Sequence, residues 1–206
     1  RRLATDFIVR GLRDDVNLPA RSEMLIIGTT TMDAPGDRAL WLARQAVEHY
    51  VRHQDLLTPP PDPPPLLKDP GAAFVTLRLG TALRGCIGTL GPTKPTLAHE
   101  IIANAVAAAS SDPRFPPVAP SELAVLLYEV DILGALEPIP GEGHLDPEQY
   151  GVVVQAGEQR GVLLPAIEGV TSARQQVTIA RAKALIRPDQ AVTLYRFTVT
   201  RFREME

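Results

Sequence analysis

Two strand patterns separated by glycines, between residues 71 and 90, constrain the fold of this chain more than any other stretch. From residue 73 to 79, apolar side chains alternate with Phe74, Thr76 and Arg78, which is the period of a half-buried strand. Gly80 and Thr81 then supply the Gly-X pair typical of a two-residue type II′ turn. We therefore expect residues 82–87 to return antiparallel to the first strand, as the central hairpin of the fold.

The elements around this hairpin mix helices with strands. The sequence predicts an amphipathic helix that begins after Asp37, an extended proline-rich connector, a buried helix, a strand, a second hairpin, a helix that begins at Thr171 and Ser172, and a last strand. Their expected ranges are 38–54, 59–65, 95–110, 126–133, 152–164, 171–184 and 191–202. No internal repeat is apparent.

Strands joined by hairpins and mixed with separate helices predict an α+β protein with a mainly antiparallel sheet and packed helices. A larger and a smaller lobe that form a cleft are one arrangement such elements allow.

Several motifs resemble those of one family. LRGCIG at residues 83–88 is followed by TLGPT, a predicted helix and DPRFPPV at residues 112–118, and this order resembles the signature of the AMMECR domain family. The segments LDPEQYGVVV, RGVLLPAIEGV and LYRFTV resemble the bacterial branch of that family. The resemblance implies an AMMECR-type domain over residues 37–206. It implies a fold and no activity, because the family has no settled biochemical function.

Residues 1–36 lie outside the resemblance and form an N-terminal extension whose role the sequence leaves open. Leu3, Phe7, Ile8 and Leu12 have the spacing of a short helix, and residues 24–27 have the composition of a strand.

Composition excludes several classes of protein. The net charge of −3 and the pI of about 5.8 argue against a general nucleic-acid binder. The single cysteine cannot form an internal disulfide, which fits a reducing cytoplasm. No apolar run approaches the roughly 20 residues of a membrane-spanning helix. We therefore expect a cytoplasmic protein without a membrane or nucleic-acid partner. Nothing in the sequence implies a cofactor, and the oligomeric state stays open.

Cys86 is the candidate catalytic residue, because a thiolate is the strongest side-chain nucleophile near neutral pH. Arg84 lies two positions away, and on a regular strand both side chains point to one face, so the guanidinium would lower the pKa of the thiol. A nucleophile also needs a general base. His99 is the nearest histidine in sequence, but the resemblance counts against it, because members of the family often carry an acidic residue at that position. The alternative is that Cys86 is a small apolar residue of the core.

The DPRFPP segment supplies candidate ligand-binding residues. Asp112 can bind backbone N–H groups, Arg114 can bind a carboxylate or phosphate, and Phe115 can stack on a ligand. The alternative is a rigid turn whose aspartate caps the backbone and whose phenylalanine packs on the core. Arg84 and Asn104 complete the candidate set, and we expect Arg84, Cys86, Asn104 and Arg114 to converge on one cleft.

His49 and His53 have the i, i+4 spacing of a metal-binding helix. No further ligands are evident in the sequence, so we expect no metal site.

Two functions follow from these residues. The first is a domain that binds a small anionic ligand or a partner segment in a cleft lined by LRGCIG and DPRFPP, with covalent chemistry at Cys86 as a further hypothesis. The second is a non-catalytic interaction module in which the same motifs are structural. An enzyme should hold the Cys86 thiol at least partly exposed with a perturbed pKa, whereas an interaction module should bury it and expose an apolar patch instead.

Overall fold

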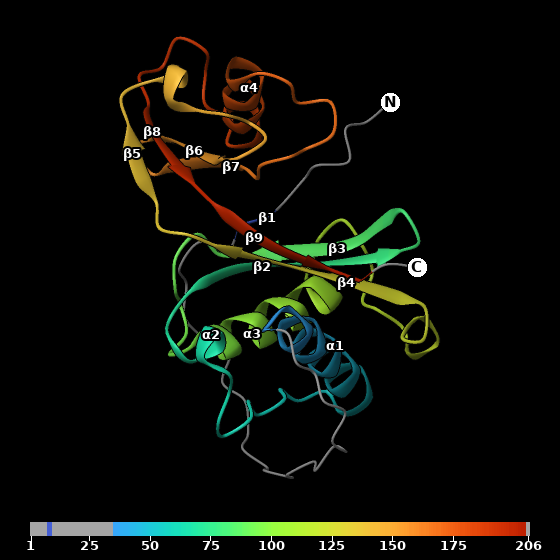
Figure 1. Ribbon diagram of the computed structural model, residues 1–206. Helices are drawn as coiled ribbons and strands as arrows, with labels where there is room; N and C mark the ends of the chain where they lie inside the picture. The colour runs from blue at the N-terminus through green and yellow to red at the C-terminus, as the bar shows by residue number, and fades with distance from the viewer. Residues whose placement is uncertain (1–7, 10–34, 205–206) are drawn as a thin grey trace. The chain divides into compact units, whose positions relative to one another are not determined.

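The computed structural model describes residues 8–9 and 35–204, which fall into two compact units (Figure 1). The larger unit comprises the described residues between 8 and 132 together with 201–204, and the smaller unit comprises residues 133–200. The protein is of the α+β class, as expected. No helix in the described part of the chain is long and apolar enough to cross a membrane.

The larger unit is built on a five-stranded sheet with the strand order β1-β3-β2-β4-β9. Its strands are β1 (Ile8–Val9), β2 (Ala72–Leu79), β3 (Ala82–Gly88), β4 (Leu126–Leu133) and β9 (Val199–Arg203). Its helices are α1 (Pro35–His53), α2 (Pro65–Lys68), α3 (Leu97–Ser110) and the single 3-10 turn η1 (Pro120–Glu122). Helices α1 and α3 lie against one face of this sheet, and the core between them is aliphatic (Figure 1).

The central hairpin forms as the sequence predicts. Leu79 pairs with Ala82, and of the two turn residues only Gly80 has a positive φ, as a type II′ turn requires. The expectation of a half-buried strand is wrong, because every residue of β2 from Ala72 to Leu77 is buried. One face of β2 packs on the helices, and the other carries Thr76 beneath a layer of polar side chains.

A β-bulge interrupts the pairing of β2 with β3. Leu77 lies opposite Gly85, whereas Arg78 lies opposite Leu83, so Arg84 is the extra residue. A bulge breaks the alternation of side chains along a strand. The expectation that Arg84 and Cys86 share one strand face by simple alternation therefore fails.

The smaller unit has a four-stranded antiparallel sheet with the strand order β5-β8-β6-β7. Its elements are β5 (Glu137–Ile139), the 3-10 turn η2 (Glu142–His144), β6 (Gly151–Ala156), β7 (Gln159–Leu163), α4 (Ala173–Lys183) and β8 (Thr193–Phe197). Ser172 caps α4, as predicted, because its hydroxyl accepts the N–H of Gln175 at 3.3 Å.

Both units contain a hairpin followed by a helix and then a strand that pairs with the first hairpin strand. In both, a glycine of the second hairpin strand lies against a helix carbonyl: Gly85 against Ala108, and Gly161 against Ala180. A Cβ atom at either glycine would collide with that carbonyl oxygen. The two units thus share the same order of hairpin, helix and strand, although the sequence contains no apparent repeat.

Several predicted boundaries differ from the structure. Residues 191–202 form two strands rather than one. Strands β8 and β9 belong to different sheets, and Thr198, which lies between them, belongs to neither strand. The carbonyl of Thr198 accepts the N–H of Gly134 at 2.9 Å. Asp37 lies in the first turn of α1 instead of capping it. Ile8 belongs to strand β1 rather than to a helix. The other residues of that expected helix, and the expected strand at 24–27, lie outside the described residues.

Candidate functional site

The side chains of Asp112 and Arg114 bind the backbone of Cys86 as a neighbouring strand would. Asp112 Oδ2 accepts the Cys86 N–H at 2.9 Å, and Arg114 Nη2 donates to the Cys86 carbonyl at 3.3 Å. Strand β1 pairs with the next two residues of β3, Ile87 and Gly88. The DPR segment therefore continues the protection of this strand edge by one residue.

Asp112 and Arg114 also bind each other. The guanidinium donates to both carboxylate oxygens, at 2.9 Å from Nε and 2.6 Å from Nη2. Burial alone would raise the pKa of Asp112, but the hydrogen bonds from Arg114 and from the Cys86 N–H outweigh it and lower this pKa. Asp112 is therefore a buried, ionised carboxylate whose hydrogen-bonding capacity is used within the protein.

Arg84 is bound by the loop that follows α3. It donates to both carboxylate oxygens of Glu122, at 2.7 and 3.0 Å, and to the carbonyls of Pro116 and Pro117 at 2.9 and 3.2 Å. The hydrogen bond from Arg84 is also the main reason that the pKa of Glu122 is lowered. These contacts leave the Arg84 guanidinium, which is nearly buried, little capacity for a ligand.

Phe115 lies between the two arginines of the motifs. Its ring centroid is 5.5 Å from the Arg114 guanidinium carbon and 6.0 Å from that of Arg84, within the range of cation–π attraction. The ring therefore contacts the two arginines, and it is not among the residues of the hydrophobic core on which the structural interpretation of DPRFPP places it.

The Cys86 thiol is fully buried. Its sulfur lies 3.1 Å from the Thr76 hydroxyl on the paired strand. Burial raises the pKa of Cys86 to about 12, although the Thr76 hydrogen bond and the charge of Arg114 act in the opposite direction. The prediction of a lowered thiol pKa is wrong, because desolvation of a thiolate here outweighs the attraction of the nearby cation.

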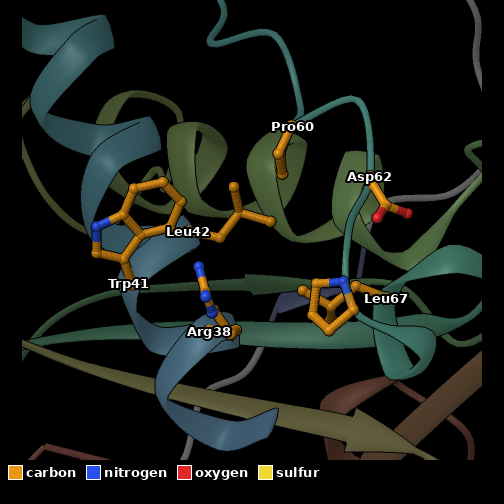
Figure 2. Close-up of a pocket in the computed structure, with 7 residues that line it drawn as sticks. Arg38, Trp41, Leu42, Pro60, Asp62 and Leu67 are labelled. Carbon is orange, nitrogen blue, oxygen red and sulfur yellow. The ribbon is translucent and has the colours of Figure 1, made fainter. Parts of the chain in front are cut away.

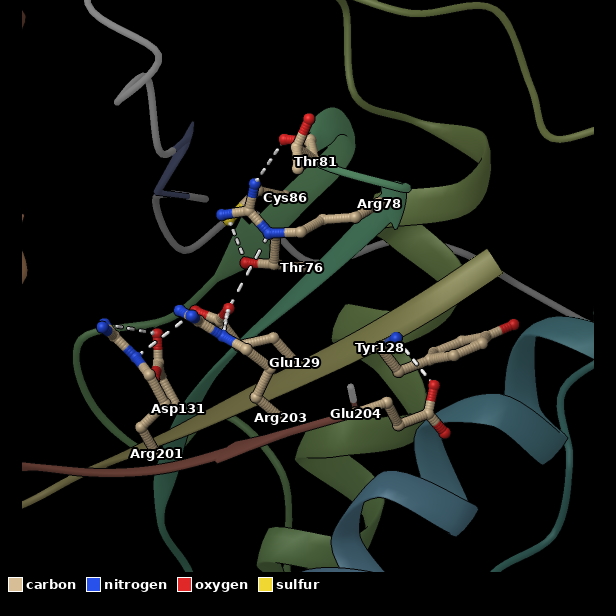
Figure 3. A network of polar contacts seen from close by, with 10 residues as sticks. All are labelled: Thr76, Arg78, Thr81, Cys86, Tyr128, Glu129, Asp131, Arg201, Arg203 and Glu204. Atoms are coloured by element: carbon tan, nitrogen blue, oxygen red, sulfur yellow. Dashed lines mark hydrogen bonds and ion pairs between the residues drawn. The ribbon is translucent and has the colours of Figure 1, made fainter. Parts of the chain in front are cut away.

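A polar layer covers the sheet face that carries Thr76 and Cys86 (Figure 3). It comprises Arg78 of β2, Glu129 and Asp131 of β4, and Arg201 and Arg203 of β9. Arg201 Nε lies 2.7 Å from Asp131 Oδ1 and 3.3 Å from Glu129 Oε1, and Arg203 Nε lies 2.7 Å from Glu129 Oε2. Arg78 Nε is 3.8 Å from Glu129.

The two carboxylates of this layer are buried, whereas the arginines reach outward. Burial raises the pKa of Asp131, and the hydrogen bond from Arg201 only partly offsets it. Glu129 and Asp131 were not among the candidate residues that the sequence suggested. Alternating charges on β4 and β9 were the signal for this layer, but strand order is needed to pair them.

Asn104 does not join the other candidates through any of its hydrogen bonds. Its amide donates to the Ala73 carbonyl at 3.0 Å and so ties α3 to the start of β2. Arg84 and Cys86 are both bound by the loop after α3, and Arg114 belongs to that loop. The expected convergence of the four residues on one cleft stays a prediction, because neither cavity of the larger unit is lined by any of them.

Glu100 is a buried carboxylate that the sequence analysis missed. It accepts hydrogen bonds from the hydroxyl of Thr89, the N–H and hydroxyl of Thr93 and the N–H of Lys94, at 2.7 to 2.9 Å. These bonds shape the loop between β3 and α3. An acidic residue on a nearly all-apolar helix face was the available signal.

The histidine pair of α1 lies beside one carboxylate. His49 Nε2 is 2.7 Å from Asp55 Oδ1, and the rings of His49 and His53 are 4.8 Å apart. Within residues 8–9 and 35–204, no three histidine, cysteine or acidic side chains are grouped to hold a metal ion. His99 hydrogen-bonds to the capping hydroxyl of Thr96 at 2.8 Å, not to Cys86.

The fold and these contacts define a class: an α+β protein of two hairpin-and-helix units, in which a proline-rich loop is fastened to the strand that carries the single cysteine. The sequence model of the AMMECR1 family matches residues 40–203. The chain therefore belongs to the AMMECR1 family.

Proteins from bacteria and archaea are similar in sequence to this chain. A Thermotoga maritima protein is 49% identical over 166 residues, which are 79% of this chain and 95% of that protein. A Clostridium acetobutylicum protein is 39% identical over 165 residues, which are 79% of this chain but 35% of that longer protein. The crystal structure of an uncharacterised Pyrococcus horikoshii protein superposes with a TM-score of 0.78 at 33% identity, and covers 82% of this chain and 91% of that one.

Proposed function

We propose that this chain is a non-catalytic protein-interaction module, in which the LRGCIG and DPRFPP motifs maintain the fold. One observation carries the proposal: the polar groups of the two motifs bind each other around a fully buried Cys86 thiol. A nucleophilic cysteine needs access and a stabilised thiolate. Cys86 has neither, since its thiol is covered and its pKa is raised to about 12.

The alternative, an anionic ligand in a cleft lined by the two motifs, has less support. Arg84 and Arg114, which would bind such a ligand, already bind Glu122 and Asp112. Two cavities of the larger unit are lined almost entirely by residues outside the motifs, with Pro117 as the one exception. The first is lined by Arg38, Trp41, Leu42, Pro60, Asp62, Pro64 and Leu67, and the second by Tyr50, Val51, Gln54, Ala109, Ser110, Pro117 and Val118. Neither includes Cys86.

Alkylation of the native protein tests this proposal. We expect iodoacetamide to label Cys86 slowly at every pH between 6 and 9, at a rate set by transient opening of the fold. The matched control carries Cys86→Ser together with Thr58→Cys, which places the single thiol at an exposed position of the connector. That thiol should react at the rate of a free cysteine, with a midpoint near pH 8.5.

Rapid labelling of native Cys86, with a midpoint below pH 8.5 that rises in Arg114→Gln, would overturn the proposal. The result would show an accessible, stabilised thiolate and would favour cysteine-dependent chemistry. Thermal unfolding of each variant separates a change in reactivity from a loss of fold.

A further inference from the structure

A cavity of about 230 Å³ lies between α1 and the proline-rich connector (Figure 2). Leu42 and Leu67, both buried, contribute apolar surface, and the indole of Trp41 also lines the cavity. Pro60 and Pro64 of the connector complete the wall. The cavity is smaller than the roughly 300–1,000 Å³ of typical small-molecule sites. It therefore suits one large anchoring side chain better than a complete ligand.

The charges at this cavity are unequal. Asp62, on the connector, is engaged by Lys68, whose Nζ lies 2.8 Å from Asp62 Oδ1. Arg38, on α1, is exposed and has no hydrogen bond or ion pair to any residue that the structure describes. Among the described residues, the charge at this cavity that lacks a partner is therefore positive, and its natural complement is a carboxylate.

The chemistry of the lining is that of a protein interface. Tryptophan and arginine are the residues most enriched among those that dominate binding energy. Trp41 is half-buried, so its ring is held in place while part of it stays accessible. The prolines restrict the opposite wall, which lowers the conformational entropy lost on binding.

We propose that this cavity, the Arg38–Trp41 pocket, recognises an acidic linear segment of a partner protein. The segment inserts one aromatic or large aliphatic side chain against Trp41 and presents a neighbouring carboxylate to Arg38. This assignment rests on the proposed function as an interaction module and supplies the chemistry of the partner.

Fluorine NMR gives a direct test, because the chain has a single tryptophan. Incorporation of 5-fluorotryptophan places one resonance at Trp41, at the pocket itself. The probe is acetyl-Glu-Phe-Glu-amide, with acetyl-Gln-Phe-Gln-amide as the charge control and acetyl-Glu-Gly-Glu-amide as the anchor control. We expect a saturable shift with the first peptide at a Kd of about 1 mM, and binding at least tenfold weaker for both controls.

Two variants examine the role of the guanidinium. Arg38→Gln should weaken binding of the acidic peptide about tenfold, and Arg38→Lys should restore part of it. Arg174→Gln is the matched control, because this substitution removes the same charge elsewhere on the protein. Arg174 is exposed on α4 and has no ion pair to a described residue. It should leave the affinity unchanged.

Absence of a saturable shift, or equal affinity for the Glu and Gln peptides, overturns the assignment. Phenylacetate binding as tightly as the peptide would also overturn it, because the site would then take a small molecule. None of these outcomes bears on the alkylation of Cys86, which tests the proposed function. Peptide binding and alkylation therefore distinguish failure of the pocket from failure of the proposed function.

Discussion

The Asp112 carboxylate accepts the backbone N–H of Cys86 at 2.9 Å across 26 positions of sequence. Through this bond the loop after α3 holds the edge of β3 at the one residue of the chain that carries a thiol. The two motifs that mark the family are thus one structural unit. The side chains of Asp112 and Arg114 bind the backbone of Cys86, and the Cys86 thiol itself is buried.

Substitution of Asp112 tests that unit. Asp112→Asn should lower the free energy of unfolding by about 2 kcal/mol at pH 7, because the charge-assisted bonds from Arg114 and Cys86 are weakened. Urea unfolding measures the loss, and Asp69→Asn, on an exposed carboxylate, is the control. Equal effects of the two substitutions would contradict a structural role for Asp112.

The same carboxylate predicts an acid dependence of stability. Because folding lowers the pKa of Asp112, its contribution is present above the unfolded value of about 3.8 and is lost as the pH falls through the folded value. The stability difference between wild type and Asp112→Asn should therefore be constant from pH 7 to about 5 and shrink below pH 4. Denaturant midpoints at stepwise lower pH measure it, and a difference that grows on acidification would refute it.

Cys86 predicts an alkaline dependence with the opposite sign. Its folded pKa of about 12 lies above the ordinary thiol value of 9.0, so the unfolded thiol ionises first. Stability should fall as the pH rises through this window, by up to about 1.4 kcal/mol per pH unit from this group. Cys86→Ser lacks this component, whereas lysines and tyrosines titrate in both proteins. Parallel stability curves for the two proteins above pH 9 would show that the thiol is not desolvated.

Gly85 should tolerate no side chain. Gly85→Ala places a Cβ against the Ala108 carbonyl of α3, and strand and helix must separate. We expect a loss of about 3 kcal/mol in the free energy of unfolding. Gly91→Ala is the control, since nothing lies within 4 Å of the added atom there. Full stability of the Gly85 variant would mean that β3 and α3 pack less closely than described.

Arg84 and Glu122 should be energetically coupled. A double-mutant cycle with Arg84→Gln and Glu122→Gln should give about 1–2 kcal/mol, because the pair is bidentate and Arg84 is nearly buried. Arg84→Lys should not rescue stability, since an ammonium cannot also reach the carbonyls of Pro116 and Pro117 with the same geometry. Additive single effects would exclude the coupling.

Local sequence determined the elements whose causes are local. Gly80-Thr81 specified the turn, the apolar runs specified α1, α3 and β4, and Ser172 specified the start of α4, because turn chemistry, periodicity and capping act within a few residues. The motifs that mark the family were also recognisable in the sequence.

Tertiary structure decided what depends on partners distant in the chain. The bulge at Arg84, the division of residues 191–202 between two sheets and the polar layer on β4 and β9 each require a strand order that periodicity does not encode. The pKa of Cys86 was decided in the same way: the sequence shows a neighbouring arginine, but only the packed fold shows that desolvation outweighs it.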